Sequence, residues 1–149
     1  MVGIGVIGFG YWGPNLVRNV ASLTTAELRV VCDRSSARLS EVGRLYPAVD
    51  LEDSAAAVLD RSDVDAVILA TPAESHFELA RRVLESGRSV FVEKPLANSA
   101  AECEQLIELA GKKNLVLMVG HTFEYNAAVE YVDDLITLRD LGQIYYIYS

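Results

Sequence analysis

Short apolar runs alternate with longer amphipathic stretches along this sequence. The apolar runs lie at residues 4–7, 28–32, 66–70, 90–92 and 115–119. They show little alternation of polar and apolar positions, which is typical of strands buried on both faces of a parallel sheet. Between them, apolar residues recur at helical spacing, as at Leu39, Val42 and Tyr46. The repeated alternation of strand and helix predicts an α/β fold with a doubly wound, mostly parallel sheet.

Two helix starts are marked by capping-box patterns. Ser75 is followed three positions later by Glu78, and Ser99 is followed in the same way by Glu102. In such a box the serine hydroxyl accepts a hydrogen bond from the third residue's amide, while the glutamate reaches back to the serine's amide. We therefore expect a helix to begin at each serine.

The pattern changes near the end of the sequence. Residues 126–141 predict a long helix, and residues 144–148, rich in Tyr and Ile, predict a strand. A single strand needs a sheet to join, so we interpret it as the first strand of a C-terminal α+β domain that is otherwise missing. A short edge strand of the main domain is the alternative. The chain therefore divides into a main domain at 1–125 and a truncated second domain at 126–149.

Composition narrows the classes of function. The 149 residues include 13 basic and 21 acidic side chains, for a net charge of −8, and without a basic cluster we expect no nucleic-acid or membrane partner. No apolar run reaches the roughly 18 residues that span a bilayer, and the N-terminus lacks a signal peptide's basic region. The two cysteines and two histidines have neither disulfide-framework nor metal-ligand spacing. We therefore expect a soluble, cytoplasmic domain without a metal.

The first predicted strand runs into a glycine-rich loop, Gly8-Phe9-Gly10-Tyr11-Trp12-Gly13-Pro14. Between a strand and a helix, this pattern is typical of the Rossmann dinucleotide-binding fold. Gly8 makes the tight turn, Gly10 lets the backbone approach a pyrophosphate, and Gly13 allows close packing of helix and strand. Pro14 suits the first turn of the helix, whose free N–H groups favour phosphate. We assign the loop to cofactor binding, including Phe9, Tyr11 and Trp12.

An acidic residue at the end of the second predicted strand indicates which cofactor is bound. Asp33 lies 20 residues after Gly13, where a carboxylate accepts hydrogen bonds from the adenosine ribose and repels a 2′-phosphate. This predicts NAD in preference to NADP. Arg34 keeps NADP open, because its guanidinium can pair with a phosphate. Otherwise Arg34 covers the adenine or faces solvent.

The third strand-end loop contains Thr71, Pro72 and, slightly later, His76. Carboxyl ends of parallel strands are where doubly wound sheets bind ligands, so we assign Thr71 and Pro72 to cofactor contact. His76 has two interpretations, a cofactor contact or a histidine that only caps its helix.

The fourth strand-end loop is Glu93-Lys94-Pro95, and the fifth begins at Gly120. A lysine that leaves a buried strand beside a proline points in a defined direction, so Lys94 is a candidate for proton exchange near the nicotinamide, with Glu93 orienting it. We assign Glu93, Lys94 and Pro95 to cofactor contact, and Lys94 also to substrate contact. In the fifth loop, candidates for substrate contact are His121, Tyr125 and Asn126, with simple loop packing as the alternative.

Four motifs in register resemble the N-terminal half of the Gfo/Idh/MocA oxidoreductases. They are the Gly8-Phe-Gly-Tyr-Trp-Gly-Pro-Asn15 loop, Thr71-Pro72 with His76, Glu93-Lys94-Pro95, and Gly120-His-Thr-Phe-Glu-Tyr-Asn126. The first and last forms are similar to the branch that acts on sugars and sugar nucleotides. Ala127, where relatives usually carry proline, is a small departure.

The resemblance implies an NAD(P)-dependent enzyme that transfers hydride between a sugar, sugar-nucleotide or cyclitol carbon and the nicotinamide. It implies that Lys94 is the catalytic lysine, which bonds both the reacting hydroxyl and the cofactor ribose. The family's second domain supplies most substrate contacts, so the present chain is expected to be inactive alone. It is also expected to form a homo-oligomer through its last strand. The alternatives are a non-catalytic dinucleotide sensor and a partner-binding module.

Overall fold

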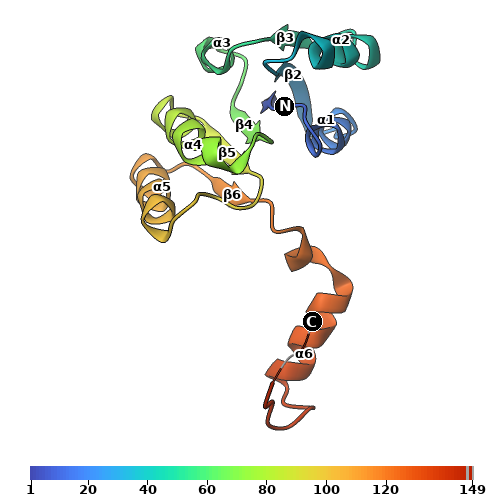
Figure 1. The fold of residues 1–149 in the computed structure, drawn as a ribbon, viewed down its shortest axis with the longest axis vertical. Coiled ribbons are helices and arrows are strands. Elements are labelled where there is room, and N and C mark those ends of the chain that lie inside the picture. Colours follow the sequence, from blue (N-terminus) through green and yellow to red (C-terminus); the bar gives the residue numbers. More distant parts are fainter. Residues whose placement is uncertain (147, 149) are drawn as a thin grey trace.

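Six parallel strands form one sheet in the computed structural model, which describes residues 1–146 and 148 (Figure 1). They lie in the order β3-β2-β1-β4-β5-β6, and every neighbouring pair is parallel. This is the doubly wound α/β fold that the sequence predicts. The strands are β1 (Val2–Ile7), β2 (Ala26–Cys32), β3 (Asp50–Glu52), β4 (Ala66–Leu69), β5 (Ser89–Val92) and β6 (Leu117–Val119).

Helices cover both faces of the sheet. Successive strand residues point to opposite sides, so the apolar strands present two apolar faces that the helices bury. Val6 and Val31 belong to a core cluster with residues of two helices, whereas Ile7 and Val30 belong to a cluster with residues of three others. The two helices of the Val6 and Val31 cluster are α1 (Gly13–Ala21) and α2 (Ser36–Leu45), on one face of the sheet. The opposite layer contains α3 (Ala55–Asp60), α4 (His76–Glu85) and α5 (Ala100–Lys113).

The order of the strands reverses between β1 and β4. From β1 the chain continues through β2 to β3 on one side, and β4 to β6 then extend the sheet on the other. The last residues of β1 and β4, Ile7 and Leu69, are paired across this point. The loops that follow these two strands therefore lie next to each other at the switch point, where doubly wound folds bind ligands.

Local features differ from the sequence predictions in several places, and the helix predicted at residues 126–141 spans only Ala127–Thr137. β3 and α3 were not predicted, because β3 has three residues at the sheet edge, Asp50–Glu52, and carries no apolar run. At Ser75 the predicted helix start is confirmed, since α4 begins at His76, but the capping box is wrong because the Ser75 side chain makes no capping hydrogen bond. Ser75 ends a 3₁₀ turn, η1 (Ala73–Ser75), with helical backbone angles, and its hydroxyl lies 2.7 Å from both Thr71 Oγ1 and the Pro72 carbonyl.

The box at Ser99 is confirmed in its first half and altered in its second. The Ser99 hydroxyl accepts from the Glu102 amide at 3.3 Å, whereas the Glu102 carboxylate accepts from the amide of Asn98 at 3.0 Å instead of that of Ser99. The helix α5 thus begins where the sequence predicts, with its glutamate turned one residue further back.

After β6 the chain forms a short 3₁₀ turn, η2 (Thr122–Tyr125), and the helix α6 (Ala127–Thr137), which extends away from the sheet (Figure 1). No residue of α6 is buried. Residues 144–146 and Tyr148 have no regular secondary structure, while Ile147, within the predicted strand, and Ser149 lie outside the described residues. The strand and its sheet therefore remain a prediction. None of the helices in the described part of the chain is long and apolar enough to cross a bilayer.

Candidate functional site

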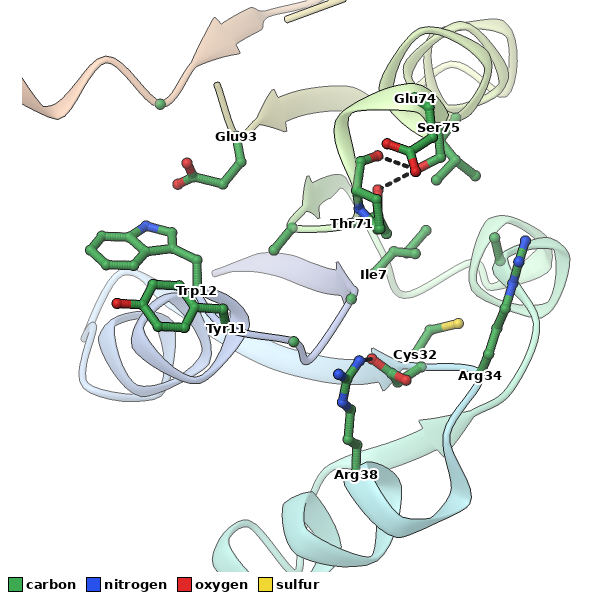
Figure 2. A pocket seen from close by; sticks show the side chains of 18 of the residues that line it. Ile7, Tyr11, Trp12, Cys32, Arg34, Arg38, Thr71, Glu74, Ser75 and Glu93 are labelled. Atoms are coloured by element: carbon green, nitrogen blue, oxygen red, sulfur yellow. Dashed lines mark hydrogen bonds and ion pairs between the residues drawn. The ribbon is translucent and has the colours of Figure 1, made fainter. Parts of the chain in front are cut away.

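A cavity of about 1170 Å³ lies at the carboxyl ends of the strands (Figure 2). It exceeds the roughly 300–1,000 Å³ of most small-molecule pockets, so it has room for an extended ligand. Trp12 and Glu93 lie towards one end of the view, and Arg34 and Arg38 lie towards the other. Loops that follow β1, β2, β3, β4, β5 and β6 all contribute to its lining.

The three glycines of the first loop have different surroundings. Gly8 has a φ of +101°, which L side chains rarely adopt. A Cβ at Gly13 would overlap the carbonyl oxygen of Gly8, so α1 and the loop approach too closely for any side chain. A Cβ added at Gly10 would have Arg38 Nη1 as its nearest neighbour, at 3.6 Å, and the residue faces the cavity. Packing within the protein therefore does not require a glycine at position 10, and the missing side chain instead leaves space in the cavity.

The helix α1 begins at this loop without a side-chain cap. Its N-cap residue, Trp12, makes no capping hydrogen bond, and proline occupies the first turn. The first N–H groups of a helix lack intrahelical partners, and they carry the positive end of the helix dipole. Because Gly10, Tyr11 and Trp12 line the cavity, this end of α1 offers the cavity an anion-binding surface.

Asp33 is buried, with 8% of its surface exposed, and it braces the glycine loop. Its Oδ2 accepts from the Phe9 amide at 2.7 Å and lies 3.4 Å from Arg38 Nη1, while its Oδ1 accepts from the Ser35 amide at 2.9 Å. A carboxylate has about four acceptor positions, and these three contacts leave one, on Oδ1. Asp33 can therefore accept one further hydrogen bond from a ligand.

Arg38 is a site residue that the sequence analysis missed. It lies on α2, five positions after Asp33, and its guanidinium is half-exposed between that carboxylate and Gly10. The signal for it was available, because Ser35 caps α2 and places Arg38 in the first turn. Together with Arg34, it gives one end of the cavity two guanidinium groups.

The loop after β4 is held by its own side chains. Ser75 Oγ lies 2.7 Å from Thr71 Oγ1, and both residues line the cavity with Pro72. Figure 2 marks this contact by a dashed line. This contact fixes the Thr71 hydroxyl at the wall of the cavity.

The loop after β5 places a carboxylate and an ammonium at the same end of the cavity. Glu93 is 9% exposed, and its Oε2 accepts from the Lys94 amide at 3.3 Å. Its Oε1 is buried and has no hydrogen-bond partner among the described residues. A buried carboxylate oxygen without a partner is costly, so Glu93 is prepared to accept a donor from a ligand. Lys94 is exposed and lines both this cavity and a neighbouring one of about 280 Å³.

Other residues assigned to the site from the sequence lie elsewhere. Phe9 is 3% exposed and packs in the core with α1 and α2. Gly13, His76 and Pro95 do not line the cavity, and His121 lines only the smaller one. Tyr125 and Asn126 line neither. Asn126 Oδ1 instead caps α6 by accepting from the amides of Ala128 and Val129 at 2.9 and 3.4 Å.

Further lining residues came without a strong sequence signal. Asp53 and Ser54 follow β3, which was not predicted, and Phe123 lies in the 3₁₀ turn after β6. Among the described residues, no group of three or more His, Cys, Asp or Glu side chains is placed to hold a metal ion.

Cys32 lines the cavity but is not a reactive thiol. Burial, and after it the charge of the adjacent Asp33, raise the pKa of Cys32 from 9.0 to about 11. Because the thiolate is the nucleophilic form, Cys32 stays protonated and unreactive at neutral pH.

Comparison with known proteins identifies the class of this fold. The family model GFO_IDH_MocA, described as "Oxidoreductase family, NAD-binding Rossmann fold", matches residues 2–121. The chain is 33% identical over 139 residues to 4-carboxy-2-hydroxymuconate-6-semialdehyde dehydrogenase of Sphingobium sp., covering 93% of this chain and 44% of that protein. It is 32% identical over 133 residues to UDP-N-acetylglucosamine 3-dehydrogenase of Acidithiobacillus ferrooxidans, covering 86% and 39%.

A solved structure agrees with these sequence matches. GenD2 from gentamicin A biosynthesis, in complex with NAD, superposes with a TM-score of 0.88 at 28% identity, covering 93% of this chain and 40% of that one. The chain thus spans less than half the length of the relatives that it matches.

Proposed function

Because this chain belongs to the Gfo/Idh/MocA oxidoreductase family, with an NAD-binding Rossmann fold, we propose that it is the cofactor-binding half of a sugar, sugar-nucleotide or cyclitol dehydrogenase. The observation that carries the proposal is one cavity that joins the uncapped start of α1 to Glu93 and Lys94. A dinucleotide needs an anion site in its middle and polar groups at both ends, which is the order of groups along this cavity.

The residues present fit a dinucleotide. Gly10 leaves free space beside the N-terminus of α1, where the pyrophosphate would be held by backbone N–H groups. The remaining acceptor position of Asp33 suits a ribose hydroxyl at one end, and the unpartnered Oε1 of Glu93 suits a hydroxyl donor at the other. Thr71 and Pro72 form the wall between them. When bound, the nicotinamide supplies the hydride donor or acceptor.

Lys94 is the group that would act on the substrate. It lies at the junction of the two cavities, so its ammonium can bond a substrate hydroxyl that enters from the smaller one. An amine there can hold the hydroxyl in place and exchange its proton as the carbon is oxidised. His121 lines the smaller cavity beside it and is the remaining candidate for substrate contact in this chain.

We assign NAD as the preferred cofactor, with Asp33 as the discriminating residue. Its buried carboxylate would face the adenosine ribose and repel a 2′-phosphate. Arg34 and Arg38 oppose this preference, because two guanidinium groups at the same end attract a phosphate. The preference for NAD over NADP is therefore expected to be moderate.

Titration of the chain with NADH tests the proposal directly. The sequence contains one tryptophan, Trp12, and it lines the cavity, so bound NADH should quench its emission and be excited by energy transfer from it. A chain that is folded by circular dichroism but leaves Trp12 emission unchanged at millimolar NADH would overturn the assignment.

Turnover separates the half-enzyme from a complete one. Hydride transfer requires the substrate carbon to be held about 3–3.5 Å from the nicotinamide, and the described chain offers few groups that could hold it. We expect the 149-residue chain to bind cofactor without oxidising sugars, cyclitols or nucleotide sugars. Rates of about 1–10³ per second in such a panel would show that no second domain is needed. A pure dinucleotide sensor is disfavoured by Lys94, since a sensor needs no cation where the substrate would lie.

A further inference from the structure

His76 joins two loops of the cavity from behind the wall. It is the first residue of α4, only 1% of its surface is exposed, and it does not line the cavity. Its Nδ1 lies 2.7 Å from the carbonyl oxygen of Pro95, and its Nε2 lies 2.8 Å from that of Thr71. One side chain therefore contacts the backbone of the loop after β4 and the backbone of the loop that carries Lys94.

The base of this side chain is held rigidly. α4 packs into the core through Ala80, Val83 and Leu84, each with no exposed surface. The ring therefore has a fixed position relative to the core, and both loops contact it there. Each loop also has contacts of its own, such as Ser75 Oγ to Thr71 Oγ1 and to the Pro72 carbonyl in the first loop, and the Lys94 amide to Glu93 and Leu96 against the core in the second.

Both partners of the ring are carbonyl oxygens, which only accept hydrogen bonds. A ring nitrogen donates to its carbonyl only when it carries a proton, so a neutral ring bonds one of the two carbonyls and packs its other nitrogen against the second, while an imidazolium bonds both. Replacement by an apolar residue would remove this donor from two part-buried carbonyls, those of Thr71 and Pro95, and a carbonyl that loses its partner away from water costs stability. The polar ring is thus required by the loops and not by the core.

We propose that His76 is a positioning residue that holds the Lys94 loop at a fixed place relative to the Thr71 loop. This rests on the proposed function, in which Thr71 contacts the cofactor and Lys94 the substrate hydroxyl. The Nε2 contact anchors the cofactor wall, and the Nδ1 contact anchors the lysine. Loss of either contact releases one loop and leaves the other in place.

Two conservative variants separate the two contacts. The amide nitrogen of Asn reaches about as far as Nδ1, so His76→Asn keeps the contact to Pro95 and loses that to Thr71. The amide nitrogen of Gln reaches about as far as Nε2, so His76→Gln keeps the contact to Thr71 and loses that to Pro95. His76→Leu removes both, and Glu78→Gln, on the exposed side of α4, is the matched control.

Hydrogen exchange and amine labelling of the whole chain report the two loops separately. We expect exchange in the segment that loses its contact to become about 2- to 12-fold faster, the range for one lost hydrogen bond. This should affect residues 71–75 in His76→Asn, residues 94–97 in His76→Gln, and both segments in His76→Leu. Labelling of Lys94 by a succinimidyl ester, measured by mass spectrometry, should change with His76→Gln but not with His76→Asn. Lys112 and Lys113, the other two lysines, are internal controls.

Equal effects of His76→Asn and His76→Gln on both segments, or no effect of either, would overturn the positioning role. If His76→Leu fails to fold, the Asn and Gln variants still decide between these outcomes. Failure of the proposed function is distinct, because it appears as absence of NADH binding in the unaltered chain. Release of the two loops by the variants is measured without cofactor and does not depend on that result.

Discussion

Replacement of Asp33 should disturb the glycine loop and the choice of cofactor by different amounts. The carboxylate accepts from the buried Phe9 amide at 2.7 Å and from the half-buried Ser35 amide at 2.9 Å. A hydrogen bond to a charged group contributes about 1.5–3 kcal/mol, and a neutral one about 0.5–1.5 kcal/mol. Because water can reach Ser35 but not Phe9, we expect Asp33→Ala to lower the free energy of unfolding by about 2–4 kcal/mol.

Asp33→Asn separates the two effects because it keeps the shape of the side chain. Its single carbonyl oxygen can still accept from Phe9, so the loss of stability should be about 1–2 kcal/mol. For NAD, the free acceptor position on Oδ1 becomes an amide NH2, which can only donate to a ribose hydroxyl, so a charged hydrogen bond becomes a neutral one and binding weakens by about 1–1.5 kcal/mol, or about 5- to 12-fold. For NADP, the repulsion of the 2′-phosphate disappears while Arg34 and Arg38 remain. The ratio of the two dissociation constants should therefore narrow by about tenfold or more.

The measurement is a pair of Trp12 fluorescence titrations, with NADH and with NADPH, beside thermal unfolding followed by circular dichroism. Asp60→Asn, an exposed carboxylate outside the cavity, makes the same change in net charge and is the control. An unchanged NADH/NADPH ratio in a folded Asp33→Asn chain would refute Asp33 as the discriminating residue. Unfolding of Asp33→Ala at the temperature of the unaltered chain would refute its bracing of the loop.

Three other changes have defined outcomes. Gly10→Val should abolish NADH binding without lowering the unfolding temperature, because the nearest protein atom to its Cβ is 3.6 Å away. Gly13→Ala should instead destabilise the fold, because its Cβ would overlap the Gly8 carbonyl oxygen. Equal effects of the two variants on binding and on unfolding would contradict these different roles. Cys32 should resist alkylation by iodoacetamide until the pH approaches its raised pKa of about 11, where its thiolate forms, while the half-buried Cys103 reacts first. Mass spectrometry of samples labelled from pH 7 to 11 measures this order. Equal labelling of the two cysteines at pH 8 would contradict it. A chain that ends after Asn126 should unfold within about 2 °C of the full one, because α6 has no buried residue, and a larger fall would show that the helix stabilises the sheet.

The parts of the fold that the sequence predicts are those in which burial and periodicity agree. β1, β2, β4, β5 and β6 each overlap one of the apolar runs. For β1, β2, β4 and β5 the reason is their place inside the sheet, because inner parallel strands are covered on both faces and need apolar residues. β3 escapes this reasoning, since an edge strand of three residues, Asp50–Glu52, needs only backbone partners. Because β3 was not predicted, Asp53 and Ser54, which follow it and line the cavity, were not identified as site residues either.

Within the site, spacing along the chain indicates which loops meet but not which way a side chain points. Gly8, Gly10 and Asp33 are predictable from their distance to strand ends, and the topology brings those ends together. Phe9 lies in the same loop, yet its ring turns into the core while its amide turns to Asp33. The motif around Asn126 predicts a ligand contact, whereas the start of α6 uses its oxygen. Such choices depend on which backbone donors lack a partner, and the sequence does not show that.

The isolation of α6 has a consequence for how this molecule can change. The chain leaves the sheet after Val119, and no residue of α6 is buried against the sheet or its helices. Substitutions at the exposed positions of α6 therefore transmit no strain to the glycine loop or to Asp33. The surface of α6 can therefore vary in sequence without a compensating change in the sheet, so the two parts of the chain are free to diverge at different rates.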